Sequence, residues 1–329
     1  MIELSAAPVV SVCVPIHNGM RFLQRLFFCL ANQSYRDFEV VAVDDGSTDG
    51  SGEEACRLLA HFGLRGRVTR IPNRGSALAR DAACALAEGS IIATLDCDDC
   101  WEPNYLAEMS AALRGHPGTD LVYCDFLEVF PDGRERVKSR AVSWVRLSDA
   151  TRDGDLYSFA RGAFFIMLLQ GQVLFPSCTV YSKELYQRAG GYAAILPDLP
   201  TSLDWSFGLR AARVGSVAFL NRPLLRKIQR NDSVSNTSFV KTATSTIRIL
   251  EEVLRDQTLS PEERQIARCY GARVSSWCAY EFWATHKKQR QAFEWVCASL
   301  RFRPNWEVVK IGAKALIPRP MVDWIRSRP

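Results

Sequence analysis

Residues 38–49 read FEVVAVDDGSTD, and this stretch decides the fold class. Residues 38–43 are apolar except for Glu39 and include three valines, and this pattern predicts a strand. The polar residues that follow are turn formers and helix-capping types, and a helix is expected to run from there to about His61. A buried strand, a polar turn and a helix make up one repeating unit of an α/β fold.

The same unit recurs along the first part of the chain. Residues 9–16 are a second apolar run, in which Pro15 is expected to end the strand because proline cannot donate to a central ladder. Residues 22–30 carry an apolar stripe at helical spacing. Further strands are expected at residues 67–71, 90–95 and 121–126, and further helices at residues 78–87 and 105–113. This alternation predicts an α/β domain with a mostly parallel sheet and helices on both faces.

The remaining chain changes character twice. Residues 131–236 are less regular and mix short strand patterns with an expected helix around residues 204–214. Beyond residue 239 only helical patterns remain, and five of the eight tryptophans lie there. A helical C-terminal appendage is therefore expected.

Composition excludes several classes of protein. Of the 329 residues, 47% are hydrophobic and 23% are charged, which excludes wholesale disorder. The net charge of +5 is too small for a dedicated nucleic-acid binder, so no nucleic-acid partner is expected. No apolar run approaches the roughly 18 residues that span a bilayer. The first residues lack the basic flank of a signal peptide, and the eleven scattered cysteines favour a reducing compartment, so a cytoplasmic location is expected.

Three carboxylates follow the strand pattern of residues 90–95. Asp96, Asp98 and Asp99 repel one another, and a cation between them would relieve the repulsion. Hard oxygen ligands suit Mg²⁺ or Mn²⁺, which bind one or two carboxylates together with substrate phosphates. The alternative is a solvated acidic turn that caps the next helix.

Other polar residues also follow expected strands, and ligands of open α/β sheets bind beyond the carboxyl ends of the strands. They are His17 and Asn18, then Asp44 and Asp45, then Asn73 with Arg74, and Arg80 on the next helix. Arg80 is expected in the first turn of that helix, where its fork of donors can reach a diphosphate. An Asx turn and a surface arginine are the structural alternatives.

Two further features of the sequence could carry chemistry. Asp204 begins an expected helix beside Trp205, where it can cap the helix or act as a base. Cys97 and Cys100 form a single C-x-x-C, which lacks the second pair that a zinc site needs.

As an ordered set, these motifs resemble the family 2 glycosyltransferases, inverting enzymes of the GT-A fold. The resemblance is carried by residues 12–19, 30–35, 38–49, 73–75, 79–80 and 95–99, and it weakens beyond about residue 130. It implies a Rossmann-like, mostly parallel sheet in a GT-A catalytic domain over residues 1–236. Residues 9–130 would bind the nucleotide, residues 131–236 would bind the acceptor, and residues 237–329 would form the helical C-terminal region.

The resemblance also implies roles for single residues. Pro15, His17 and Asn18 would line the base pocket, Asp45 would read the uracil edge, and Asn73 would belong to the same nucleotide site. Arg80 would face the nucleotide, and Asp96 would contact the ribose or the second shell of the metal. Asp98 would be the direct ligand of Mn²⁺ or Mg²⁺, with Asp99 close by. The family usually has asparagine where this chain has Asp81, and often tyrosine where it has His17.

The catalytic base implied by the resemblance is Asp204, although Leu203 replaces the acidic neighbour that is usual there. A basic loop would close over the diphosphate, with Arg230 as the chosen residue and Arg226 and Lys227 as competitors. The implied reaction moves a sugar from a nucleotide sugar, preferably UDP-linked, to a hydroxyl of a glycan or a lipid-linked saccharide.

Three alternative functions compete with this interpretation. A catalytically inactive nucleotide-sugar-binding protein of the same fold would keep most of these residues. A sugar nucleotidylyltransferase would need a Gly-rich phosphate loop that residues 9–25 do not supply, and a dinucleotide oxidoreductase would need G-x-G-x-x-G, whereas Gly19 stands alone. Residues 308–325 are basic and amphipathic, which suits peripheral membrane contact or docking against the chain's own domain.

Overall fold

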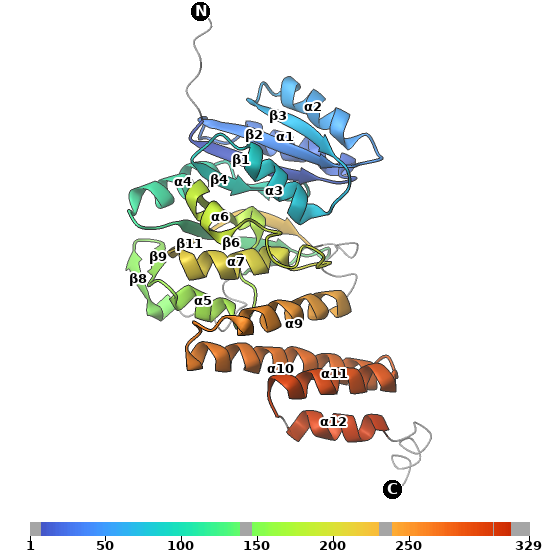
Figure 1. Cartoon of the computed structure of the whole chain (residues 1–329). Helices are drawn as coiled ribbons and strands as arrows, with labels where there is room; N and C mark the ends of the chain where they lie inside the picture. The colour runs from blue at the N-terminus through green and yellow to red at the C-terminus, as the bar shows by residue number, and fades with distance from the viewer. Residues whose placement is uncertain (1–7, 139–146, 230–238, 305, 317–329) are drawn as a thin grey trace, which may run out of the picture. The chain divides into compact units, whose positions relative to one another are not determined.

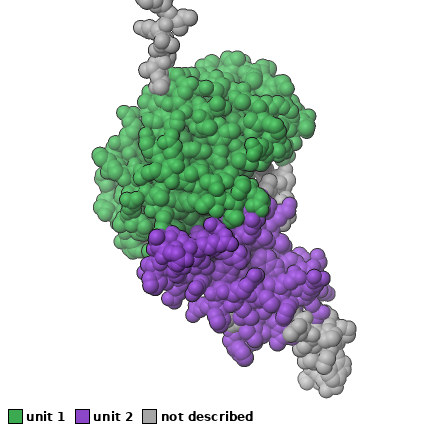
Figure 2. Space-filling view, in the orientation of Figure 1, with its two compact units in different colours: residues 1–168, 172–198, 203–231 green, residues 169–171, 199–202, 232–329 purple. Residues whose placement is uncertain are grey.

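The computed structural model describes residues 8–138, 147–229, 239–304 and 306–316. The chain separates into two compact units, coloured in Figure 2. Unit 1 comprises residues 1–168, 172–198 and 203–231, and unit 2 comprises residues 169–171, 199–202 and 232–329. Each unit is described by itself.

Unit 1 is built on one sheet, with the strand order β3-β2-β1-β4-β10-β6-β11-β9-β8 (Figure 1). The first four strands are parallel, as is the pair β6–β11, and this confirms the expected α/β class. Their bounds are β1 Val10–Ile16, β2 Phe38–Asp45, β3 Gly66–Ile71, β4 Ile91–Thr94, β6 Leu121–Val129 and β11 Val217–Ile228. The antiparallel members are β10 Thr179–Ser182, β9 Leu156–Phe159 and β8 Ala150–Asp153, with β5 Cys100–Trp101 on β11 and β7 Glu135–Val137 on β6.

Helices cover both faces of the sheet because the strands are apolar on both faces. Val10, Val12 and Val14 of β1 share a buried core with apolar residues of α1 Met20–Ala31, α2 Ser51–His61 and α4 Tyr105–Gly115. The alternate residues of a strand point to the opposite face. There, Cys13 meets Cys84 of α3 Ser76–Leu86. Short helices α5 Ala163–Leu168 and α6 Lys183–Ala189 and the longer α7 Leu203–Val214 complete unit 1.

The prediction that β1 ends at Pro15 is wrong, since the strand runs to Ile16 with Pro15 opposite Val43 of β2. The Cys13 carbonyl accepts a hydrogen bond from Leu95 N–H at 3.0 Å, on the side of β4. Residues two apart in a strand point the same way. Pro15 therefore faces the side where β4 has already ended at Thr94, and its missing N–H removes no ladder bond there.

Strand β10 was not expected, and it separates β4 from β6 by pairing antiparallel with both. Its four residues are too few for a clear periodicity. The short 3-10 helix η3 Pro176–Cys178 leads directly into β10. Residues 172–178 are thereby brought to the edge of the sheet where β4 ends, since Thr94 Oγ1 donates to the Pro176 carbonyl at 2.7 Å.

The pairing of β5 with β11 brings an acidic and a basic segment together. In this antiparallel register, Cys100 lies opposite Arg226. Asp99 and Lys227 come directly beyond the end of this ladder, and their carboxylate and ammonium groups lie 3.7 Å apart.

Unit 2 is helical, with α9 Phe239–Arg255, α10 Pro261–Ala284, α11 Gln289–Phe302 and α12 Trp306–Leu316. Helix α10 starts at a capping box in which Ser260 and Glu263 each accept from the backbone N–H of the other. Within the described ranges, no helix is both long enough and apolar enough to cross a membrane.

Candidate functional site

The loops after β1, β2 and β3 meet through a small hydrogen-bonded cluster. His17 Nδ1 lies 2.8 Å from the Asp45 carbonyl, which only accepts, so Nδ1 carries the proton. Nε2 is then an acceptor, with Nδ2 of Asn18 at 3.2 Å and Nδ2 of Asn73 at 3.3 Å. Asn18 Oδ1 accepts from Thr48 N–H at 2.8 Å. The structure thus brings His17, Asn18, Asp45 and Asn73 together, as expected of strand ends on one edge.

Asp45 is buried, and its carboxylate organises the loop after β3. One oxygen accepts from Arg74 N–H at 2.7 Å and the other accepts from Gly75 N–H at 2.8 Å. A carboxylate has about four acceptor sites, so both oxygens retain acceptor capacity beyond these two bonds. The adjacent Asp44 instead accepts from Ser47 N–H and pairs with Arg70 at 3.2 Å.

Arg80 is the fifth residue of α3, so the prediction of a first-turn position is wrong by one turn. It is only 5% exposed, which also excludes the surface-arginine alternative. Its Nη2 donates to Asp96 at 2.6 Å, and its guanidinium carbon lies 4.9 Å from the centre of the Tyr192 ring. Burial lowers the pKa of Arg80, but Asp96, Tyr192 and Asp204 together outweigh burial, so the pKa is raised. Nε of Arg80 has no hydrogen-bond partner in the described part of the chain.

Tyr192 is held under Arg80 by Asp81, the residue that departs from the family pattern. Asp81 Oδ1 accepts from Tyr192 N–H and from the Tyr186 hydroxyl, both at 2.7 Å, and Oδ2 accepts from Ala193 N–H at 2.9 Å. The turn needs Gly191, which has φ +79° and whose Cβ, if present, would lie 2.9 Å from Asp81 Oδ1. Asp81 therefore positions the ring on which the Arg80 guanidinium rests.

The acidic loop after β4 is folded into a turn. Asp99 N–H donates to the Asp96 carbonyl at 3.0 Å, and Asp96 N–H donates to Ser177 Oγ at 3.0 Å. Asp96 and Asp98 are half-buried, whereas Asp99 is buried. The pKa of Asp99 is raised to about 6. Burial is the main cause, the Asp96 and Asp98 carboxylates also raise the pKa, and the nearby Lys227 ammonium lowers it.

These carboxylates fit a divalent ion that shares its shell with phosphates. No group of three or more histidine, cysteine or acidic side chains is arranged to hold a metal among the residues described. Mg²⁺ commonly keeps only one or two protein carboxylates and takes its other ligands from phosphate and water, so the donor set is compatible with such an ion. Asp99 Oδ2 is buried without a hydrogen bond, with Lys227 as its ion-pair partner.

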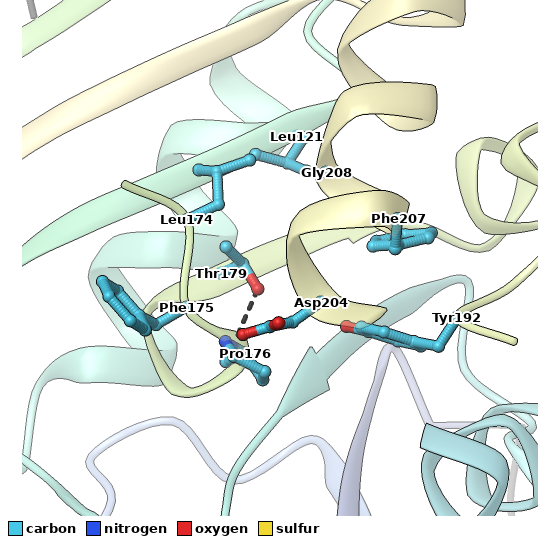
Figure 3. Close-up of a pocket in the computed structure, with 9 residues that line it drawn as sticks. All are labelled: Leu121, Leu174, Phe175, Pro176, Thr179, Tyr192, Asp204, Phe207 and Gly208. Carbon is cyan, nitrogen blue, oxygen red and sulfur yellow. Dashed lines mark hydrogen bonds between the residues drawn. The ribbon is translucent and has the colours of Figure 1, made fainter. Parts of the chain in front are cut away.

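Asp204 lies in the first turn of α7, beside a small hollow with a volume of about 10 Å³. Figure 3 shows its side chain near Pro176 and Tyr192, with Phe207 one helical turn on. The hollow is lined by Leu121, Leu174, Phe175, Pro176, Thr179, Tyr192, Asp204, Phe207 and Gly208. Burial raises the pKa of Asp204, and the nearby Asp96 carboxylate raises it further. Arg80 and the hydrogen bonds donated by Trp205 N–H and Gln172 lower it.

Electrostatic interactions and hydrogen bonds link Asp204 to the loops after β1 and β2. Arg80 interacts electrostatically with both Asp204 and Asp96. Cys97, next to Asp96, is hydrogen-bonded to the backbone of His17. The same thiol packs so closely on Gly19 that a Cβ there would lie 3.0 Å from its sulfur.

Three residues of this candidate site were not predicted from the sequence, and one of the three basic candidates lies beside the acidic loop. Gln172, Ser177 and Tyr192 lie in the irregular middle region, where only the Gly190-Gly191 turn before Tyr192 gave a signal. Lys227 lies beside Asp99, whereas Arg226 forms an ion pair with Glu135. Arg230 lies outside the described residues.

A family model described as glycosyl transferase family 2 matches residues 11–190, more than half of the chain. The chain belongs to glycosyl transferase family 2. This family 2 protein is 32% identical over 125 residues to a putative glycosyltransferase EpsH of Bacillus subtilis, covering 38% of the chain and 36% of that relative. It is 33% identical over 131 residues to a hyaluronan synthase of Pasteurella multocida, covering 40% of the chain and 13% of that relative. The chain thus spans well under two thirds of either protein.

Two solved structures resemble the family 2 protein along nearly its whole length. S. aureus TarS 1-349 in complex with UDP-GlcNAc has a TM-score of 0.65 at 19% identity, covering 97% of this chain and 87% of that chain. The mannosyltransferase PcManGT from Pyrobaculum calidifontis, in complex with GDP-Man and Mn2+, has a TM-score of 0.56 at 20% identity, covering 97% and 84%. At such identities the likeness shows the fold, and it confirms the GT-A architecture.

Proposed function

We propose that this protein is an inverting glycosyltransferase that moves a sugar from a nucleotide sugar, preferably UDP-linked, to an acceptor hydroxyl. One observation carries the proposal. The half-buried carboxylate of Asp204 borders a hollow and interacts with Arg80 and Asp96, which lie in the same contact network as the loops after β1 and β2. A base, an arginine and acidic residues around one edge of an α/β sheet suit transfer from an activated diphosphate donor. UDP-GlcNAc and GDP-Man in the similar structures support the donor class.

The nucleotide would lie over the loops after β1, β2 and β3. The base pocket comprises Pro15, His17, Asn18 and Asn73, and Asp45 accepts from the uracil edge with the acceptor capacity that its loop bonds leave unused. The same carboxylate accepts from Arg74 N–H and Gly75 N–H, so it would also hold the loop that follows Asn73 in place. Arg80 would face the nucleotide, and its buried Nε has no hydrogen-bond partner among the described residues.

Asp98 would be the direct ligand of Mn²⁺ or Mg²⁺, with Asp99 close by and Asp96 toward the ribose or the outer shell of the ion. When bound, the ion supplies positive charge that stabilises the departing diphosphate. Mn2+ in the similar mannosyltransferase structure supports this assignment. Arg226, Lys227 and Arg230 remain the basic candidates for the diphosphate. Of the two that the structure describes, Lys227 is supported by its ammonium lying 3.7 Å from Asp99, whereas Arg226 pairs with Glu135.

Asp204 would act as the general base. It takes the proton from the acceptor hydroxyl as that oxygen attacks the anomeric carbon from the face opposite the diphosphate. One such displacement inverts the configuration. The raised pKa of Asp204 makes it a stronger base than an exposed aspartate.

The test is a panel of nucleotide sugars, each assayed for Mn²⁺-dependent binding and for release of the free nucleotide with and without saccharide acceptors. The proposal expects binding of at least one UDP-sugar and release that increases with an acceptor. Binding without release under any condition would instead identify the catalytically inactive alternative. Binding of none would contradict the proposal.

The acceptor we propose is a hydroxyl of a glycan or a lipid-linked saccharide, which peripheral contact with a cytoplasmic membrane face would bring within reach. In α12, Trp306 is 71% exposed and Lys310 is exposed, which supports such contact. Residues 317–325 of the proposed segment lie outside the described residues. Co-sedimentation with anionic liposomes tests this. Equal pelleting of the full chain and of a chain ending at residue 305 would contradict the membrane role.

A further inference from the structure

Gln172 makes the most direct side-chain contact to Asp204. Its Nε2 donates to Asp204 Oδ2 at 2.6 Å, and the same nitrogen donates to the Leu174 carbonyl at 3.2 Å. The two residues are far apart in sequence and come from different elements, the loop before η3 and the start of α7. The contact therefore depends on the tertiary fold and is not a local turn.

The orientation of the Gln172 amide follows from its neighbours. The carboxylate of Asp204 and the carbonyl of Leu174 both only accept hydrogen bonds, so the amide nitrogen and not its oxygen must face them. An amide nitrogen has two hydrogens, and each has one acceptor here. Leu174 also lines the hollow beside Asp204, so the amide ties the carboxylate to the wall of that hollow.

The second oxygen of the carboxylate is held independently. Asp204 Oδ1 accepts from Trp205 N–H at 2.9 Å. One donor on each oxygen fixes the plane of the carboxylate and leaves about two acceptor sites for a further ligand. A base with its lone pairs already oriented loses less freedom when it receives a proton.

We propose that Gln172 is a positioning residue that orients Asp204 and keeps its carboxylate ready to accept the proton of the incoming hydroxyl. This inference rests on the proposed function, in which Asp204 is the base. Gln172 touches neither the donor nor the reacting atoms in this scheme. It acts through Asp204.

The proposal predicts a change in the pH profile that a purely structural role would not produce. Burial is the largest influence on the charge of Asp204 and disfavours the carboxylate. Arg80 from α3 favours the carboxylate, Trp205 N–H and Gln172 stabilise it by donation, and Asp96 after β4 disfavours it. Removing the Gln172 donor raises the pKa of the base. Activity, which needs the deprotonated form, is then lost at a higher pH as the solution is acidified.

The experiment compares wild type with Gln172→Met, which keeps the length of the side chain but has no donor, and with Gln172→Glu, which replaces the donor by an acceptor. The matched control is Gln187→Met, at an exposed glutamine on α6. In Gln172→Met, the pH at which kcat falls on acidification should move up by about one unit. At pH values below this fall, kcat should be about tenfold lower than in wild type, at an unchanged KM for the nucleotide sugar. In Gln172→Glu this pH should move up further.

The outcomes separate this inference from the proposed function. Folded Gln172 variants with a wild-type acid limb overturn the inference, and so does a limb that moves to lower pH. If Gln172→Met fails to fold, the nearly isosteric Gln172→Glu carries the test. Asp204→Asn is measured in parallel. Full turnover by that variant would contradict the role of Asp204 as the base. If Asp204→Asn is inactive but the pH profile of Gln172→Met is unchanged, only the role of Gln172 is rejected.

Discussion

The guanidinium of Arg80 donates a 2.6 Å hydrogen bond to the carboxylate of Asp96. The arginine is almost fully buried on α3, and the aspartate is 29% exposed in the loop after β4. This pair joins the helix that follows β3 to the acidic loop, and Arg80 also interacts with Asp204. The arginine therefore connects the acidic loop of the proposed metal site with the proposed base.

Replacing Arg80 should damage both stability and binding. Arg80→Met leaves Asp96 without its partner, and we expect the free energy of unfolding to fall by about 2 kcal/mol, below the full value for a buried pair because Asp96 is partly solvated. Arg80→Lys keeps the charge but not the fork, so it should weaken UDP binding with a smaller loss of stability. Urea denaturation and UDP titration measure the two effects. The control is Arg57→Lys, at an exposed arginine that pairs with Glu54. An Arg80→Met variant as stable as wild type would show that the Arg80–Asp96 pair does not stabilise the fold.

Asp204→Asn should keep the nucleotide site intact and lose transfer. The amide preserves the shape of the side chain but cannot take a proton, so we expect a fall in kcat of about 10²- to 10⁴-fold with an unchanged Kd for UDP. Acceptor-dependent release of nucleotide and UDP titration are the two measurements. Asp149→Asn, at an exposed aspartate remote in sequence, serves as the control. Full turnover by Asp204→Asn would remove this residue from the mechanism.

Asp98→Ala should lose the metal dependence of UDP binding. Without the ligand, addition of Mn²⁺ no longer tightens the nucleotide, whereas wild type should bind UDP more weakly after EDTA treatment. Calorimetric titration of UDP with and without Mn²⁺ measures this difference, and Asp149→Ala controls for the loss of one negative charge. Identical titrations of Asp98→Ala and wild type in both conditions would count against the proposed ligand.

The activity of the wild-type enzyme should fall on the acid side at a pH above the ordinary pKa of aspartate, about 4. Burial raises the pKa of Asp204, and the base works only when deprotonated, so activity is present above this raised pKa and is lost as the pH falls through it. The measurement is kcat/KM against pH at saturating Mn²⁺. An acid limb at the ordinary value would mean that a solvated carboxyl, and not Asp204, limits the reaction.

Substitutions at Asp81 and at its partner Tyr186 should reduce stability by different amounts. Asp81→Ala removes the acceptor of two backbone N–H groups and of the Tyr186 hydroxyl, and should lower the free energy of unfolding by about 3 kcal/mol. Tyr186→Phe removes one of the three hydrogen bonds and should cost about 1 kcal/mol. Urea midpoints compare the two. Equal midpoints for Asp81→Ala and Tyr186→Phe would show that the backbone bonds to the Tyr192 loop add nothing.

Much of the site could be predicted because parallel strands end on the same edge of a sheet. His17, Asn18, Asp45 and Asn73 follow three such strands, and their hydrogen-bonded cluster is a direct consequence of strand order. The end of β1 was misplaced because local rules for proline ignore where the neighbouring strand stops. The helix turn of Arg80 was misplaced because α3 begins two residues earlier than its apolar pattern indicates.

The sequence by itself determined the class of fold, the family and the segments from which the polar groups come, since these depend on periodicity and on short-range spacing. Only the tertiary structure decided which distant partners meet: Lys227 with Asp99 through the β5–β11 register, Asp81 with the Tyr192 backbone, and Gln172 with Asp204. Such pairs depend on strand register and on the insertion of β10 between β4 and β6. A register is set by the packing of whole faces, so no local pattern in the chain records it.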